Sequence, residues 1–119
     1  MNGNAERPRV LVIDDDDRLH FVLCRLLKPL ASRVASCRSA DEAKEMFEPG
    51  RFDVVLCDLH IPGVVGLELV EWLCERDAGV RCVVMTGFAS EGDAVGITEL
   101  GAELLQKPFT AEQLGLAIQ

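Results

Sequence analysis

The chain has 119 residues, 49% of them hydrophobic, and carries 12 basic against 20 acidic side chains, for a formal net charge of -8. This length fits one domain with a single core, and the apolar fraction argues against a disordered chain. Because phosphate contacts need clustered Lys and Arg, the negative charge disfavours direct binding to nucleic acid or to an anionic membrane.

Short apolar runs and segments of helical periodicity alternate five times along the chain. A run that is apolar at every position is typical of a strand buried on both faces, whereas spacings of three and four residues indicate a helix. In chain order the expected elements are strand 10–13, helix 19–27, strand 34–37, helix 40–47, strand 54–57, helix 67–74, strand 80–85, helix 89–100, strand 103–106 and helix 111–119. We expect the polar residues 1–8 to form a flexible lead and 9–119 to form the domain.

Two helices carry distinctive local signals. Ser39 with Glu42 three residues later resembles a capping box, which opens the helix 40–47. Gly92 and Gly96 weaken a later helix by roughly 1 kcal/mol each relative to Ala. That helix is therefore expected to be mobile.

The alternation predicts an α/β domain whose right-handed crossovers place helices on both faces of a mostly parallel sheet. The carboxyl ends of parallel strands share one edge, and ligands bind outside that edge in folds of this kind. Five polar residues at strand ends are therefore expected to converge: Asp14, Asp15, Asp58, Thr86 and Lys107. Asp58 follows the central run VVLC, and its alternative role is to cap the turn that continues through Pro62 and Gly63.

The expected chemistry of this edge depends on its charges. Three carboxylates gathered together repel one another unless a cation joins them. Mg²⁺ prefers oxygen ligands and is typically held by one or two carboxylates, with other positions left for water and phosphate oxygens. The ammonium of Lys107 and the hydroxyl of Thr86 can contact the same phosphoryl group. The set therefore predicts a phosphoryl site with a carboxylate as acceptor, and the alternative is a group of salt-bridged strand ends.

Four segments carry a resemblance to a known family. VLVIDDDD, VVLCDLHIPGVVG, VVMTG and LLQKPF resemble, in order and at strand ends, the segments of receiver domains of two-component response regulators. The resemblance covers nearly the whole chain and implies a flavodoxin-like, three-layer (βα)5 fold, whose five-stranded parallel sheet has the order 2-1-3-4-5. It also implies a phosphoacceptor in a phosphorelay, with a histidine kinase or a histidine phosphotransfer protein as its partner.

The resemblance assigns the metal and acceptor roles position by position. Asp58 matches the phosphoacceptor. The implied ligands of Mg²⁺, or of Mn²⁺ in its place, are Asp15 directly, Asp14 mainly through water, Asp58 itself and the backbone carbonyl of His60.

The resemblance also implies a switch. Thr86, followed by Gly87, and Lys107 match residues that contact phosphoryl oxygens after transfer. In the family, movement of the residue matched by Thr86 remodels the face formed by the fourth helix, the fifth strand and the fifth helix. A homodimer on that face is a further expectation.

The chain departs from the family pattern at the switch. The family usually has an aromatic residue or His three residues before the lysine, where this chain has Leu104, so an aromatic flip cannot report activation. The segment GAELLQKP is also one residue shorter than the commoner pattern, which favours a receiver module of a hybrid sensor kinase. Phe88 and His60 occupy positions that tune the hydrolysis of the acyl phosphate in the family, and Phe88 is predicted to shield it.

Two other function classes remain open on the sequence. A small phosphatase would form an aspartyl phosphate on Asp58 and hydrolyse it, but such enzymes place an acid where this chain has His60. A degenerate receiver would act only as a binding module, although one of the acidic, Thr or Lys positions is normally lost in that class. We therefore expect a signalling phosphoacceptor rather than an enzyme that acts on a separate substrate.

The cysteines and the hydropathy bear on location. The five cysteines are an odd number without a CxxC pair, so we expect mostly buried thiols of a reducing compartment, and neither a disulfide framework nor a zinc site. No apolar run approaches the about 20 residues that cross a bilayer, and the start MNGNAERPR lacks the apolar core of a signal peptide. These features predict a cytoplasmic protein without membrane insertion.

Overall fold

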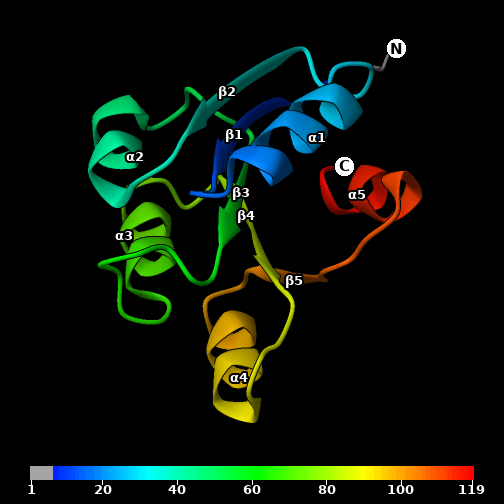
Figure 1. The fold of residues 1–119 in the computed structure, drawn as a ribbon. Coiled ribbons are helices and arrows are strands. Elements are labelled where there is room, and N and C mark those ends of the chain that lie inside the picture. Colours follow the sequence, from blue (N-terminus) through cyan, green and yellow to red (C-terminus); the bar gives the residue numbers. More distant parts are fainter. Residues whose placement is uncertain (1–6) are drawn as a thin grey trace.

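Five parallel strands form the centre of residues 7–119, the part of the chain that the computed structural model describes (Figure 1). The strands are β1 (Arg9–Ile13), β2 (Arg33–Cys37), β3 (Val54–Asp58), β4 (Arg81–Thr86) and β5 (Glu103–Gln106). The helices are α1 (Asp17–Leu27), α2 (Ala40–Met46), α3 (Glu68–Arg76), α4 (Glu91–Glu99) and α5 (Ala111–Ala117). The sheet order is β2-β1-β3-β4-β5, which confirms the predicted α/β fold and its 2-1-3-4-5 topology.

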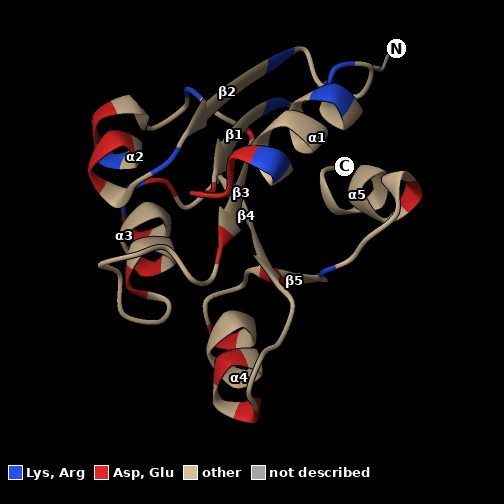
Figure 2. Ribbon diagram, in the orientation of Figure 1, with Lys and Arg blue, Asp and Glu red and all other residues tan. Residues whose placement is uncertain are grey.

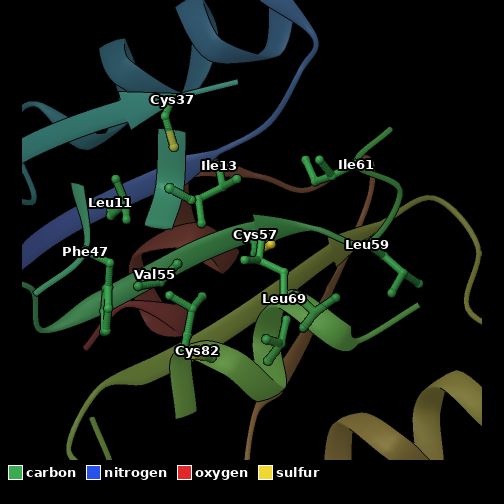
Figure 3. Close-up of a cluster of buried hydrophobic side chains, with 14 of the residues drawn as sticks. Leu11, Ile13, Cys37, Phe47, Val55, Cys57, Leu59, Ile61, Leu69 and Cys82 are labelled. Carbon is green, nitrogen blue, oxygen red and sulfur yellow. The ribbon is translucent and has the colours of Figure 1, made fainter. Parts of the chain in front are cut away.

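The alternation of side chains along a strand explains why the central strands are apolar at almost every position. In β1, Val10 and Val12 join the core beneath α1 and α5, whereas Leu11 and Ile13 join the core beneath α2, α3 and α4. All four side chains are fully buried. The second of these cores is drawn in Figure 3, where residues of β1, β2, β3 and β4 meet on one face of the sheet. Since both faces are covered, the central strands β1 and β3 are buried along almost their whole length, whereas the edge strands β2 and β5 stay partly exposed.

Side-chain caps set the starts of most helices. The carboxylate of Asp16 accepts backbone N–H groups from Arg18 and Leu19 at 2.9 and 3.4 Å, which makes it the N-cap of α1. The Ser39 hydroxyl accepts the Glu42 N–H at 3.2 Å, as the capping box predicts. The Glu42 carboxylate, however, accepts the N–H of Arg38 and not that of Ser39, so the reciprocal half of the box is displaced by one residue.

Many element boundaries differ from the sequence-based expectation by one or two residues. The helix α4 starts at Glu91 and not at 89, because Ser90 and Asp93 form a capping box that fixes its first turn. The strand β4 starts one residue later than expected, since the Val80 N–H bonds the carbonyl of Asp77 in a turn. The last helix ends at Ala117 instead of continuing to 119.

Residues 1–6 of the predicted flexible lead lie outside the described part of the chain, and β1 starts at Arg9, where the domain was expected to begin. Within residues 7–119 no helix has the length and apolar content needed to span a bilayer. Three of the five cysteines are buried as expected, whereas Cys24 and Cys74 are half-buried.

Candidate functional site

The carboxyl ends of β1, β3, β4 and β5 bring the predicted polar residues together. Figure 2 shows acidic positions at the ends of β1 and β3. Oxygen atoms of Asp14, Asp15 and Asp58 all lie within 4.8 Å of one another. The ammonium of Lys107, in the segment that follows β5, lies 3.2 Å from Asp58 Oδ2 and 3.7 Å from Asp14 Oδ2. The convergence expected of these strand ends is therefore present.

Asp58 is the last residue of β3 and is 8% exposed. Its Oδ1 accepts the backbone N–H of His60 at 3.0 Å, and its Oδ2 accepts from the Lys107 ammonium at 3.2 Å. The turn continues through Gly63 at φ 82° and Gly66 at φ 52°, in the left-handed region that favours glycine. Asp58 thus stabilises the turn with one carboxylate oxygen and pairs with the Lys107 ammonium through the other.

Asp14 is fully buried, and its two oxygens have different surroundings. Oδ1 accepts the N–H of Asp16 at 2.8 Å, whereas Oδ2 has no hydrogen-bond partner among the described residues and has the Lys107 ammonium 3.7 Å away. Burial raises the pKa of Asp14, and the negative charges of Asp58 and Asp15 add to this, while the Asp16 N–H and Lys107 oppose it. A buried oxygen of this kind is suited to a cation.

The site fits a hard divalent cation on two observations. It offers carboxylate oxygens at the mutual distances that one ion can bridge, and one of these oxygens is buried without a hydrogen bond. Asp15 is exposed, so one side of the group is open to water. An oxygen-rich, partly open site of this kind is typical of Mg²⁺, which keeps several of its waters.

Thr86 ends β4 and is 1% exposed. Its hydroxyl donates to the carbonyl of Phe88 at 2.8 Å and accepts the Phe88 N–H at 3.2 Å. The Nε2 atom of His60 lies 3.3 Å from the same Oγ1. A hydroxyl has one proton and two lone pairs, so with the proton given to Phe88 the imidazole must donate from Nε2. All three hydrogen-bonding positions of Thr86 are then in use.

The contact between His60 and Thr86 was missed by the sequence interpretation. The two residues are 26 positions apart, and His60 had been assigned to the metal through its backbone carbonyl and to a position that tunes acyl phosphate hydrolysis, with no contact to Thr86. The signal that was available is the register of the sheet, in which Asp58 is paired with Met85. Residues just beyond these ends, in the loops after β3 and β4, are therefore neighbours.

The remaining switch positions lie around Thr86. The Lys107 N–H donates to the Thr86 carbonyl at 2.8 Å and so ties the ends of β4 and β5. Leu104 pairs in register with Val84 and is 42% exposed, while Gly87 is exposed and a Cβ there would meet nothing within 4 Å.

The chain matches the family model of the response regulator receiver domain over residues 10–119. The chain belongs to this family. It is therefore a signalling domain of the response regulator type, and receiver domains bind Mg²⁺ at an acidic pocket.

Two curated relatives of this receiver domain illustrate the match. It is 36% identical over 110 residues to the C4-dicarboxylate transport transcriptional regulatory protein DctD of Pseudomonas aeruginosa, covering 89% of this chain and 23% of DctD. It is 37% identical over 101 residues to the transcriptional regulatory protein FixJ of Azorhizobium caulinodans, covering 84% of this chain and 48% of FixJ. The chain thus spans less than half of the length of these relatives.

Solved structures agree with the fold of the receiver domain. A response regulator protein from Burkholderia pseudomallei, described with a phosphorylated aspartic acid, a calcium ion and citrate, is 33% identical at a TM-score of 0.83, over 93% of this chain and 66% of that one. The non-phosphorylated HemR receiver domain of Leptospira biflexa is 28% identical at a TM-score of 0.84, over 95% of each chain. The relatives named above are transcriptional regulators, so attachment to a hybrid sensor kinase stays a prediction.

Proposed function

We propose that Asp58 of this receiver domain accepts a phosphoryl group from a phosphohistidine of a histidine kinase or a histidine phosphotransfer protein. The observation that carries the proposal is the convergence of three carboxylates and one ammonium at a single edge of the sheet. The Burkholderia pseudomallei relative, whose description names a phosphorylated aspartic acid and a bound cation, supports the same assignment.

The transfer uses groups that this site holds. An Asp58 carboxylate oxygen attacks phosphorus, the O–P bond forms, the N–P bond of the donor breaks, and its electron pair returns to the imidazole nitrogen. Lys107, already 3.2 Å from Asp58 Oδ2, is placed to contact a phosphoryl oxygen and to offset its charge. Thr86 contributes its hydroxyl once that group turns away from the Phe88 carbonyl. The protein acts here on its own carboxylate and not on a separate substrate.

Mg²⁺ is the proposed cofactor, with Mn²⁺ as a substitute of similar ligand preference. Its proposed ligands are Asp15, Asp58 and the backbone carbonyl of His60, with Asp14 acting mainly through water. When bound, the cation neutralises the charge that develops on the phosphoryl oxygens.

The proposed partner approaches beside Lys107. A groove of about 500 Å³ between α1 and the segment after β5 is lined by Leu19, Val22 and Leu26 on one side and by Lys107, Pro108 and Phe109 on the other. An apolar helix of a partner that seats there lies next to the ammonium that pairs with Asp58. This arrangement supports a helical phosphohistidine protein as the donor.

The output side of the proposal concerns the face of α4, β5 and α5. Movement of Thr86 is proposed to remodel this face, with Leu104 in the place of the usual aromatic residue, and a homodimer there stays a prediction. We propose no contact between this domain and nucleic acid, because its charge is strongly negative. That statement concerns these 119 residues and not the longer transcriptional regulators that they resemble. The cytoplasmic location also stays a prediction.

Intact mass measurement after incubation with acetyl phosphate and Mg²⁺ tests the proposal. We expect a gain of one phosphoryl group that is lost in Asp58→Asn, lost when a chelator removes the metal, and kept in Asp41→Asn, which changes an exposed carboxylate of α2. A folded protein that binds Mg²⁺ but gains no phosphoryl group would contradict the proposal and favour the degenerate binding module. Rapid turnover of acetyl phosphate without a stable adduct would favour the phosphatase.

A further inference from the structure

Two thiols outside the phosphoacceptor site are in contact. Cys74, in the last turn of α3, and Cys82, near the start of β4, have their sulfur atoms 3.7 Å apart. Within residues 7–119, which include all five cysteines, no other pair of cysteine sulfurs makes a contact of this kind. Cys74 and Cys82 lie on consecutive elements, because α3 ends at Arg76 and β4 begins at Arg81.

The two residues differ in their exposure to solvent. Cys82 is 3% exposed and belongs to the core between the sheet and α3, where Figure 3 labels it. Cys74 is half-buried at the rim of the same core. Burial raises the pKa of Cys82, and the neighbouring Cys74, Cys57 and Asp77 raise it further. Because Cys74 is the more exposed of the two residues, a small oxidant in solution is expected to reach it first.

We propose that Cys74 and Cys82 form an oxidation-sensitive dithiol, which a hydroperoxide such as H₂O₂ converts to a disulfide between α3 and β4. This site is independent of the proposed role of Asp58. The oxidation involves only the two sulfurs and the oxidant, and a reductant such as a small thiol reduces the disulfide again.

The reaction balances in two steps. The Cys74 sulfur attacks one peroxide oxygen, the O–O bond breaks, and a sulfenic acid forms while the second oxygen leaves as water after taking a proton. The Cys82 sulfur then attacks the Cys74 sulfur, the S–O bond breaks, and the hydroxide leaves as water with the Cys82 proton. The two thiols lose two electrons and two protons in total, and one H₂O₂ is reduced to two molecules of water.

The geometry makes the second step short. A disulfide has an S–S distance of about 2.05 Å, so the sulfurs approach by roughly 1.7 Å from their present separation. Cys74 lies two residues before the end of α3, whereas Cys82 lies in β4 and pairs in register with Val55. The buried position of Cys82 also protects the second thiol from direct oxidation.

Peroxide treatment of the folded, reduced protein tests this assignment. After treatment, the protein is unfolded in denaturant so that buried thiols also react, free thiols are blocked with an alkylating agent, and the protein is analysed by intact mass and peptide mapping. We expect two of the five cysteines to resist alkylation, the mass to fall by two hydrogens before blocking, one peptide link between 74 and 82, and full reversal by dithiothreitol.

Three variants sharpen the test. Cys24→Ser removes the other half-buried cysteine, which lies in α1, and is expected to leave the disulfide intact. Cys74→Ser is expected to abolish it. Cys82→Ala keeps the buried site apolar without adding volume and is expected to stop the reaction at oxidised Cys74, so a result remains even if one variant folds poorly. Fluorescence of Trp72, the one tryptophan of the chain, checks that each variant is folded.

Several outcomes would overturn the proposal. Wild-type protein that accumulates sulfinic acid on Cys74 without a 74–82 link would show that Cys82 does not resolve the sulfenic acid. Loss of two hydrogens in Cys74→Ser would assign the chemistry to other cysteines. Because phosphorylation of Asp58 is read by a separate mass gain, failure of the disulfide and failure of the phosphoacceptor role are distinguishable.

Discussion

His60→Ala is predicted to strengthen the binding of a phosphoryl group at Asp58. In the resting structure the hydroxyl of Thr86 is held by the backbone of Phe88 and by the imidazole of His60. A phosphoryl group at Asp58 must draw this hydroxyl away from those partners. The imidazole therefore competes with the phosphoryl group for Thr86, and removing it lowers the cost of the rearrangement.

The magnitude follows from the single hydrogen bond that is lost. The substitution keeps the His60 N–H that holds Asp58 Oδ1, and it keeps both bonds between Thr86 and Phe88. One hydrogen bond contributes about 0.5–1.5 kcal/mol. The bond here is 3.3 Å long and His60 is exposed, so the lower part of that range applies. At about 1.4 kcal/mol per factor of ten, the affinity is expected to rise about 2- to 5-fold.

The assay is calorimetric titration with beryllofluoride, a stable mimic of the phosphoryl group, in the presence of Mg²⁺. His60→Ala is expected to lower the Kd by this factor in the wild-type background and to have no effect in a Thr86→Ala background, where the hydroxyl is absent. An unchanged or higher Kd in His60→Ala would refute the competition. An equal gain in affinity with and without the Thr86 hydroxyl would show that His60→Ala only opens the path of beryllofluoride to Asp58.

Three further predictions concern charge, helix packing and hydrolysis. Burial raises the pKa of Asp14, so the folded protein binds this proton more tightly than the unfolded chain, and without metal the free energy of unfolding falls as pH rises through the raised pKa. Asp14→Asn is expected to remove this pH dependence of the free energy of unfolding, measured by urea titration, and to stabilise the metal-free protein by about 1–2 kcal/mol. The same substitution is expected to weaken the stabilisation by Mg²⁺, which for a single site is about 2.7 kcal/mol at a Mg²⁺ concentration of 100 times the Kd. Gly92→Ala is expected to stabilise the fold by about 0.5–1 kcal/mol, whereas Gly96→Ala should gain less because its Cβ would lie 2.7 Å from Leu67 Cδ1; equal midpoints of thermal unfolding would contradict this contact. Phe88→Ala is expected to shorten the lifetime of the acyl phosphate, because the Phe88 ring, which is 75% exposed in this structure, is predicted to shield it from water. An unchanged rate of decay, measured by intact mass, would refute the shielding.

The fold was predictable because two periodicities in the sequence are unambiguous. Runs such as 10–13 and 54–57 are apolar at every position, which only a strand covered on both faces requires, and the helices between them carry single apolar stripes. Once the strands are parallel, their carboxyl ends must meet, so the grouping of Asp14, Asp58 and Lys107 follows from topology and not from side-chain detail.

The contacts that could not be predicted depend on side-chain direction. The bond from His60 to Thr86 needs the loop after β3 to turn the imidazole toward β4, which the sequence does not encode as a pattern. The contact of Cys74 with Cys82 likewise depends on how α3 is rotated over the sheet, so an odd number of cysteines suggested independent buried thiols. The start of α4 was misplaced because Ser90 and Asp93 were not recognised as a capping box.

The two roles that the sequence left open for Asp58 are compatible in one geometry. The N–H of His60 holds Oδ1 as a turn residue would, and this fixes the carboxylate so that Oδ2 faces the Lys107 ammonium. Lys107 meanwhile lies within ion-pair distance of both Asp14 and Asp58, and so partly neutralises the site before any cation arrives. A divalent cation that takes over this neutralisation leaves the ammonium available for a phosphoryl oxygen. The turn is therefore what orients the acceptor, and a substitution that removes the His60 N–H, such as His60→Pro, is expected to impair phosphorylation although Asp58 itself is unchanged, whereas His60→Ala keeps this bond.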